Sequence, residues 1–267
     1  MHPEVFQFHF LGQQRIFYSY GLMLILAGCC GTLMMAYLAR RSGADAWDAI
    51  YVALLAIVGG LVGALGLDVL VNYRLYWQQP QFPGMVFFGG LMGGAAASLA
   101  FIRHFRLPLR VLMDAAAPAL ALGHAVGRVG CFLGGCCYGQ VTKHPWAVVY
   151  NDMRAPATAL SQGLEGLHPV QLYEASGLLA ICIGLLVCGR LSRLKGSIFA
   201  IYLLAYAGLR LFTETLRADP ERGRWLMFST SQWIAISAVC AGLLLLWWNS
   251  GTRKRLDPPS AGGIREG

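Results

Sequence analysis

Apolar residues fall into seven runs, each long enough to cross a bilayer, and short polar segments separate them. A transmembrane helix needs about 20 predominantly apolar residues, and each run supplies close to that length. The runs cover roughly residues 18–38, 47–71, 84–102, 111–133, 170–189, 197–216 and 228–248. The pattern predicts an all-α polytopic membrane protein with seven transmembrane helices, in a single membrane-embedded domain over residues 1–250.

Basic residues predict the orientation of these helices. Of the 21 Lys and Arg residues, 12 follow the first, third, fifth and seventh runs, 7 lie in the other polar segments, and Arg128 and Arg210 fall within runs. Cytoplasmic loops carry the excess of Lys and Arg. The N-terminus is therefore expected outside and the C-terminus in the cytoplasm, with residues 251–267 as a disordered cytoplasmic tail. The net charge of +8 reflects this topology and predicts no nucleic-acid partner.

The composition supports a membrane protein: 57% of the residues are hydrophobic and 13% are charged, against about 25% charged in soluble domains. Five of the eight cysteines lie in apolar runs and are expected to pack as small hydrophobic residues. Cys131, Cys136 and Cys137 differ because they lie together at the end of the fourth run.

Three interpretations of these three cysteines remain open. They are small residues without a chemical role, or they form a disulfide, or they act as a covalent relay or as metal ligands together with His124 or His168. Their Cys-x4-Cys-Cys spacing is not a recognised zinc pattern, so we expect neither a metal nor another cofactor.

Ionisable and polar residues within the runs are candidate site residues, because an ionisable side chain in hydrocarbon is costly unless it faces protein or a water-filled cavity. Arg128 lies in the glycine-rich fourth run, which also holds Asp114 and His124, and it has no obvious partner on its own helix. In the sixth run, positions i, i+4, i+8 and i+11 form one helix face. These positions are Tyr206, Arg210, Glu214 and Arg217.

Two arginines at membrane depth favour an anionic ligand, since the planar guanidinium binds two phosphate oxygens. The most available such ligand is a phospholipid. A structural Arg210–Glu214 bridge is the alternative for that pair. The glycines spaced four apart between Gly123 and Gly139 indicate either close helix packing or a break in the helix.

Four sequence elements together resemble the prolipoprotein diacylglyceryl transferase family. They are Tyr20-Gly-Leu-Met23, the Gly-Arg-Val-Gly-x-Phe-x-x-Gly-x-x-x-Gly frame from Gly127, His168-Pro-Val-Gln-Leu-Tyr-Glu174, and the Tyr206, Arg210, Glu214, Arg217 face. The resemblance extends from about residue 17 to about residue 245. It implies a seven-helix enzyme of the bacterial inner membrane, with the N-terminus outside.

The resemblance also implies the reaction and the partners. A diacylglyceryl group passes from phosphatidylglycerol to the lipobox cysteine thiol in the signal-peptide region of a prolipoprotein, and glycerol phosphate leaves. Membrane lipids surround the enzyme. The resemblance implies substrate-binding roles for Arg128, Arg210, Tyr20, Gln171, Gly139 and Arg217. It implies that Tyr20, Tyr206 and Glu214 line the same cavity. We expect catalytic roles for Arg210, Glu214, Tyr206 and, by its position, His168.

The chain departs from the family pattern near the chemistry. Phe88 stands at a family histidine, Cys131 and Gly134 at family asparagines, Cys136 at a family glutamate, and Gly63-Ala64 at a Gly-Arg pair. The candidates for the base are therefore His168, His124 and Glu214. His168 is favoured by position, with a plain helix-entry role as its alternative. Two other functions remain open: the same lipid donor with another acceptor, and a non-catalytic lipid-binding or thiol-sensing membrane protein.

Overall fold

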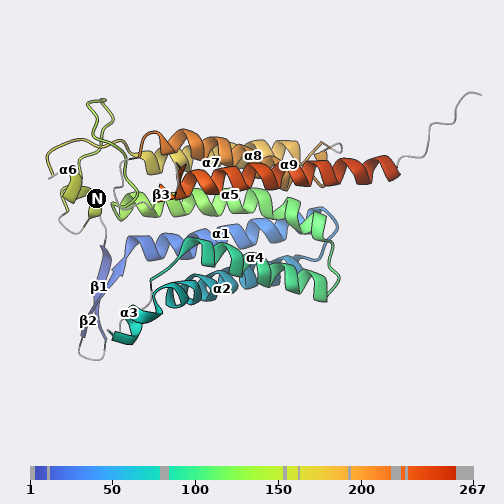
Figure 1. Cartoon of the computed structure of the whole chain (residues 1–267), viewed down its shortest axis with the longest axis horizontal. Coiled ribbons are helices and arrows are strands. Elements are labelled where there is room, and N and C mark those ends of the chain that lie inside the picture. Colours follow the sequence, from blue (N-terminus) through green and yellow to red (C-terminus); the bar gives the residue numbers. More distant parts are fainter. Residues whose placement is uncertain are drawn as a thin grey trace, which may run out of the picture.

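The computed structural model is a bundle of long helices with short strands and loops gathered mainly at one end (Figure 1). It describes residues 4–10, 13–78, 84–152, 155–161, 163–191, 194–217, 224–225 and 228–256. The helices are α1 (Ser19–Arg41), α2 (Ala46–Val71), α3 (Tyr73–Gln78), α4 (Phe87–His104), α5 (Leu109–Leu133), α6 (Pro156–Ser161), α7 (Val170–Cys188), α8 (Ile198–Glu214) and α9 (Thr230–Leu256). The strands are β1 (Glu4–Phe10), β2 (Gln13–Tyr18), β3 (Arg224–Trp225) and β4 (Phe228–Ser229).

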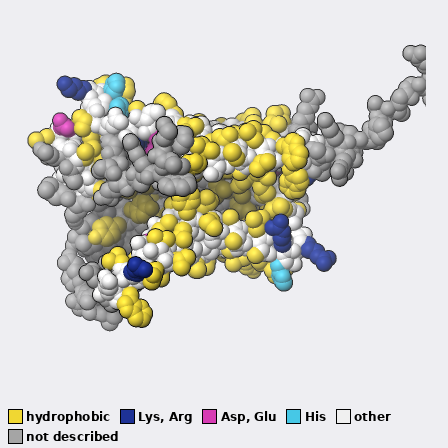
Figure 2. Space-filling model, viewed as in Figure 1, with side chains coloured by type: hydrophobic (Ala, Val, Ile, Leu, Met, Phe, Trp, Pro, Cys, Tyr) yellow, Lys and Arg dark blue, Asp and Glu magenta, His cyan; other side chains and the backbone are white. Residues whose placement is uncertain are grey.

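The seven predicted runs coincide with the seven long helices, so the helical membrane architecture is confirmed. Within the described residues, five of these helices are long and apolar enough to span a bilayer: α1, α2, α5, α7 and most of α9. The other two, α4 and α8, have 18 and 17 residues. Figure 2 shows the flank of the bundle covered by hydrophobic side chains, with Lys and Arg side chains visible only toward its two ends.

The strands were not predicted. β1 and β2 form an antiparallel hairpin ahead of α1, and β3 and β4 form a second, shorter one ahead of α9. At its other end α9 continues to Leu256, six residues into the segment expected as the tail. Residues 257–267 of that tail, and most of the basic segment from Arg217 to Arg224, lie outside the described residues.

Small residues allow the helices to approach closely. On α2, a Cβ at Gly59 would lie 2.6 Å from the Ala97 Cβ and 2.8 Å from the Gly93 oxygen of α4. On α5, a Cβ at Gly130 would lie 2.9 Å from the Met23 Cβ of α1. Close packing, which favours association of membrane helices, is therefore one use of the glycines. The helix does not break among them until Gly134, directly after α5.

Asp114 has a structural role at the end of the bundle opposite to the strands. Its Oδ1 accepts hydrogen bonds from the backbone nitrogens of Ile198 at 3.0 Å and Phe199 at 3.4 Å, and its carboxylate also accepts one from Gly196. The first amides of a helix have no partner within the helix, and a carboxylate there satisfies them. Asp114 thus fastens the start of α8 to α5.

Candidate active site

Five charged side chains lie together between α5, α7 and α8, and we call them the arginine–glutamate cluster: Arg128, Glu174, Arg210, Glu214 and Arg217. Glu174 is the centre. Its Oε2 lies 2.9 Å from Arg128 Nε and 3.7 Å from Arg217 Nη1, and its Oε1 lies 2.5 Å from Arg210 Nη1. Three helices thus meet at one carboxylate.

Arg210 is held from several sides. Its Nη2 donates to Ser231 Oγ of α9 at 2.6 Å and lies 3.4 Å from Glu214 Oε2. Thr213 Oγ1 donates to Glu174 Oε1 at 3.2 Å. The expected Arg210–Glu214 pair therefore exists, but as one contact of a larger network. Such a network fixes the direction in which the guanidinium points.

The cluster is buried and carries an excess of positive charge. The Glu174 side chain is 2% exposed and the arginine side chains are 3–13% exposed. Among the residues that the structure describes, three arginines face two glutamates, which leaves one formal positive charge. Buried charges are costly unless they are paired. A monovalent anion placed at the cluster would balance this remaining charge.

Tyr206 and His124 form the edge of the cluster toward the bundle centre. Their rings lie 5.4 Å apart, and Arg128 Nε also donates to His124 Nε2 at 3.3 Å. His124 therefore accepts from the cluster and supports the position of Arg128. Tyr206 lies on the same face of α8 as Arg210, as the spacing predicted.

Gln171 and Gly139 connect the cluster to the segment that follows α5. Gln171 is fully buried, and its Nε2 donates to the Cys136 oxygen at 2.7 Å and to Tyr150 Oη at 3.2 Å. Gly139 pairs as an isolated bridge with Arg217. A Cβ on Gly139 would lie 2.6 Å from the Cβ of His168, so only glycine fits there without movement.

His168 lies in a different group. Its Nδ1 is 3.3 Å from Tyr173 Oη, its ring lies 5.4 Å from that of His144, and Trp146 Nε1 donates to the same Tyr173 hydroxyl at 2.7 Å. Partial burial, and then the neighbouring His144, lower the pKa of His168 below its ordinary 6.5. The structure thus places His168 in a cluster of aromatic and histidine side chains ahead of α7, and among the described side chains it contacts Tyr173 and His144 rather than the arginines.

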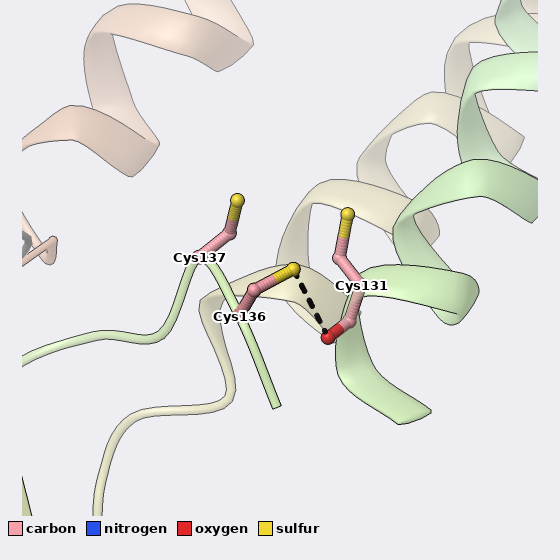
Figure 3. A group of neighbouring side chains, drawn as sticks. All are labelled: Cys131, Cys136 and Cys137. Atoms are coloured by element: carbon pink, nitrogen blue, oxygen red, sulfur yellow. Dashed lines mark hydrogen bonds between the residues drawn. The ribbon is translucent and has the colours of Figure 1, made fainter. Parts of the chain in front are cut away.

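The three cysteines come together at the end of α5, and we call them the thiol cluster: Cys131, Cys136 and Cys137. Their Sγ atoms all lie within 4.8 Å of one another, and all three thiols are free and partly buried. Figure 3 shows the Cys131 and Cys137 side chains pointing the same way, with the Cys136 thiol directed at the Cys131 carbonyl, 3.7 Å away. Tyr20 lies nearby, packed over Gly130 and Gly134.

Hydrogen bonds with the neighbouring thiols, and then the positive charges of Arg217 and Arg128, lower the pKa of the Cys137 thiol. The thiol cluster therefore lies within electrostatic reach of the arginine–glutamate cluster.

Phe88, which stands at the family histidine position, lies in a different part of the bundle. It is 38% exposed in the first turn of α4, which packs on α2.

The sequence interpretation missed the central residue. Glu174 belongs to the quoted His168–Glu174 motif, yet it was assigned no role, and Ser231 was not singled out at all. A carboxylate three positions after Gln171 in an otherwise apolar helix is the signal that identifies Glu174. Nothing in the sequence distinguishes Ser231, because its role comes only from the position of α9 beside α8.

Fold and site together define a polytopic membrane protein with a buried, arginine-rich site suited to an anionic group. The family model for prolipoprotein diacylglyceryl transferase matches residues 7–248. The chain therefore belongs to the prolipoprotein diacylglyceryl transferase family, as the resemblance predicted.

Individual relatives agree with the family assignment. The phosphatidylglycerol–prolipoprotein diacylglyceryl transferase of Clostridium tetani (strain Massachusetts / E88) is 30% identical over 234 residues, which are 85% of this chain and 91% of that protein. The transferase 2 of Clostridium perfringens (strain 13 / Type A) is 30% identical over 85% of this chain and 89% of its own length. The Synechococcus elongatus transferase is 30% identical over 252 residues, 89% of this chain and 85% of that protein.

Proposed function

We propose that this chain transfers a diacylglyceryl group from phosphatidylglycerol to the lipobox cysteine of prolipoproteins. The observation that carries the proposal is the buried arginine–glutamate cluster, whose described residues carry one formal positive charge in excess. The phosphodiester of phosphatidylglycerol carries one negative charge, so the lipid headgroup and the cluster are matched in charge. The relatives' names supply the same two substrates.

In the proposed reaction the arginines stabilise the leaving group. A thiolate attacks the glyceryl carbon, a C–S bond forms, and the C–O bond to phosphate breaks. The electron pair stays on glycerol phosphate, which gains negative charge as it leaves. Fixed guanidinium groups in a water-poor site stabilise that charge without having to reorganise. Arg128 and Arg210 are the donor-binding arginines, with Arg217 completing the positive side.

The other site residues have supporting roles in this proposal. Tyr206, Tyr20 and Glu214 line the lipid cavity, Gln171 and Gly139 hold its wall, and Glu214 orients Arg210. His168 accepts the proton of the incoming thiol, because its lowered pKa keeps it neutral at pH 7. Its contacts with Tyr173 and His144 ahead of α7 support a proton transfer near the start of that helix.

We further propose seven membrane spans in the inner membrane, with the N-terminus outside. At about 1.5 Å per residue, α4 and α8 measure about 26–27 Å, close to the ~30 Å hydrocarbon thickness. The C-terminal ends of α1, α4, α7 and α9, which contain or precede the basic clusters, gather at one end of the bundle (Figure 1). Reporter fusions at Ser42 and the C-terminus should read as cytoplasmic, and one at Lys143 as external. An external C-terminus would contradict this topology.

The test of function is transfer of labelled diacylglyceryl from phosphatidylglycerol to a lipobox peptide by the purified protein. Arg128→Ala and Arg210→Ala should each abolish transfer, since each loses charge-assisted contacts that contribute about 1.5–3 kcal/mol apiece. Arg110→Ala is the matched control, because Arg110 lies over the Trp248 ring at the other end of the bundle, 4.8 Å from its centroid. Normal transfer by either site variant would refute the donor-binding assignment.

The acceptor is tested in the same assay. A lipobox peptide with serine in place of cysteine should accept nothing. Transfer to the serine peptide, or phosphatidylglycerol binding without transfer to the cysteine peptide, would favour a different acceptor or a lipid-binding protein.

A further inference from the structure

We propose that the thiol cluster binds one thiophilic divalent cation of the zinc class, and that the open fourth position of this cation binds the sulfur of the acceptor cysteine. The second half rests on the proposed function. The cation would replace the polar residues that the family usually has at Cys131 and Cys136. The spacing of the cysteines did not predict such a site, and their proximity in the fold is the new observation.

The geometry of the thiol cluster fits a three-sulfur site. Zinc–sulfur bonds are about 2.3 Å long, so three sulfurs around one ion lie about 3.8–4.0 Å apart. The three Sγ atoms already lie within 4.8 Å of one another. Closing onto an ion therefore requires movements of less than about 1 Å, which rotation of the side chains supplies.

The backbone is shaped to bring the three thiols together. α5 ends just after Cys131, and Gly135 (φ 67°) then turns the chain back through a left-handed conformation. Cys137 is itself left-handed, with φ 61°. This conformation is uncommon for a residue with a side chain, and strain of this kind clusters at functional sites. It is Cys137 whose thiol points alongside that of Cys131 in Figure 3.

Positive charge lies beside the thiol cluster. Three thiolates around a divalent ion carry one net negative charge, and Arg217 pairs with Gly139, two residues after Cys137. Soft thiolate ligands select zinc and other thiophilic ions over magnesium or calcium.

The site has an open position. Within the part of the chain that the structure describes, the group consists of three cysteines and no fourth His, Asp or Glu ligand. Three protein ligands with a free position are typical of catalytic zinc sites, whereas structural sites have four. All three cysteine residues are partly exposed, which leaves access for a ligand from outside.

A thiol is the ligand that this position would activate. A metal-bound thiol is deprotonated outright, and its proton passes to His168, the base of the proposed function. The bound sulfur then attacks the glyceryl carbon, the C–S bond forms, and the C–O electron pair departs with glycerol phosphate beside the arginines. Such a site compensates for Phe88, which stands where the family has a histidine.

Cobalt(II) is the probe for the first half, because cobalt–thiolate charge-transfer absorption reports sulfur ligands directly. The purified, reduced full-length protein should bind one cobalt(II) per chain and lose the absorption when zinc(II) is added. Cys131→Ser/Cys136→Ser/Cys137→Ser should bind none. The control Cys29→Ser/Cys188→Ser/Cys240→Ser should bind as the unchanged protein does. Less than stoichiometric binding by the unchanged protein, or equal binding by the cluster variant, would overturn the site.

The second half is tested by adding a lipobox peptide to the cobalt(II) protein. The cysteine peptide should increase the charge-transfer absorption, and the serine peptide should not. An unchanged spectrum with both peptides would overturn the acceptor role. Metal removal should lower transfer at least tenfold, with recovery by zinc(II) and not by magnesium(II).

The same samples separate the two proposals. The cluster variant should still elute as a monodisperse protein and bind phosphatidylglycerol, because the arginines are intact. If the unchanged protein binds cobalt(II) and the peptide but transfers nothing, the proposed function fails while the metal site stands. If it transfers lipid but binds no metal, the function stands and this inference fails.

Discussion

Replacing Glu174 with glutamine removes the charge on which the arginine–glutamate cluster converges, at nearly constant volume. Glu174 is 2% exposed and faces Arg128, Arg210 and Arg217. Its neutralisation raises the formal excess of the cluster from one positive charge to two. Removing one partner of a buried ion pair costs about 3–5 kcal/mol, because the remaining charge is left buried without compensation.

Glu214→Gln is the matched control for this change. Glu214 is 13% exposed, its Oε2 lies 3.4 Å from Arg210 Nη2, and Ser229 Oγ donates to its Oε1 at 2.7 Å, a bond that glutamine preserves. We expect a loss of about 1–2 kcal/mol for this variant. For a chain of this size, about 3–5 kcal/mol corresponds to a fall in Tm on the order of 10 °C.

The assay is thermal unfolding of both variants in the same detergent, followed by tryptophan fluorescence. Glu174→Gln should unfold at the lower temperature by a clear margin, and phosphatidylglycerol should stabilise it, since an anion replaces part of the lost charge. Equal unfolding temperatures for the two variants, or a larger loss for Glu214→Gln, would refute Glu174 as the centre of the cluster.

Three further changes test other parts of the site. Transfer by the unchanged protein should fall when acidification passes the lowered pKa of His168 and protonates it. His168→Gln should not show this fall, and a pH–rate profile that is the same in the variant would exclude His168 as the base. Gly139→Ala should cost about 1–3 kcal/mol, because its Cβ would lie 2.6 Å from His168 Cβ and 2.6 Å from Val170 Cγ2, whereas Gly127→Ala has open space on helix α5 and should not be destabilised. Asp114→Ala should cost about 1–2 kcal/mol through loss of the α8 cap, measured by denaturation at unchanged phosphatidylglycerol binding.

The helices were predictable because their signal is local. Each apolar run matches one helix to within a few residues at its start, and the Tyr206–Arg217 spacing correctly placed Arg210 and Glu214 on one face of α8. The β1–β2 hairpin was missed because its seven-residue first strand is short and precedes the first apolar run. The extension of α9 beyond the seventh apolar run was not predicted because its last residues are basic and polar.

The centre of the site was not predictable in the same way. The sequence indicated no partner for Arg128 on its own helix, where His124 in fact accepts its hydrogen bond. Its charged partner Glu174 lies 46 positions later on α7, at a contact that only the packing of α5 against α7 creates. Likewise the spacing of the three cysteines indicated no metal, while the turn after α5 brings their sulfurs together. Periodicity identifies a helix face but does not identify the helix opposite it.

The two neighbouring clusters explain how the chain departs from its family at some positions and not at others. A leaving phosphate needs fixed positive charge, and few arrangements provide it at membrane depth, so the arginines of the donor site are constrained by the substrate itself. Activating a thiol is chemically less restrictive, because a neutral histidine or a bound cation can each remove its proton. The side of the site that meets the acceptor is therefore free to exchange asparagine and glutamate for Cys131 and Cys136, provided that the negative charge it gains stays beside Arg128 and Arg217.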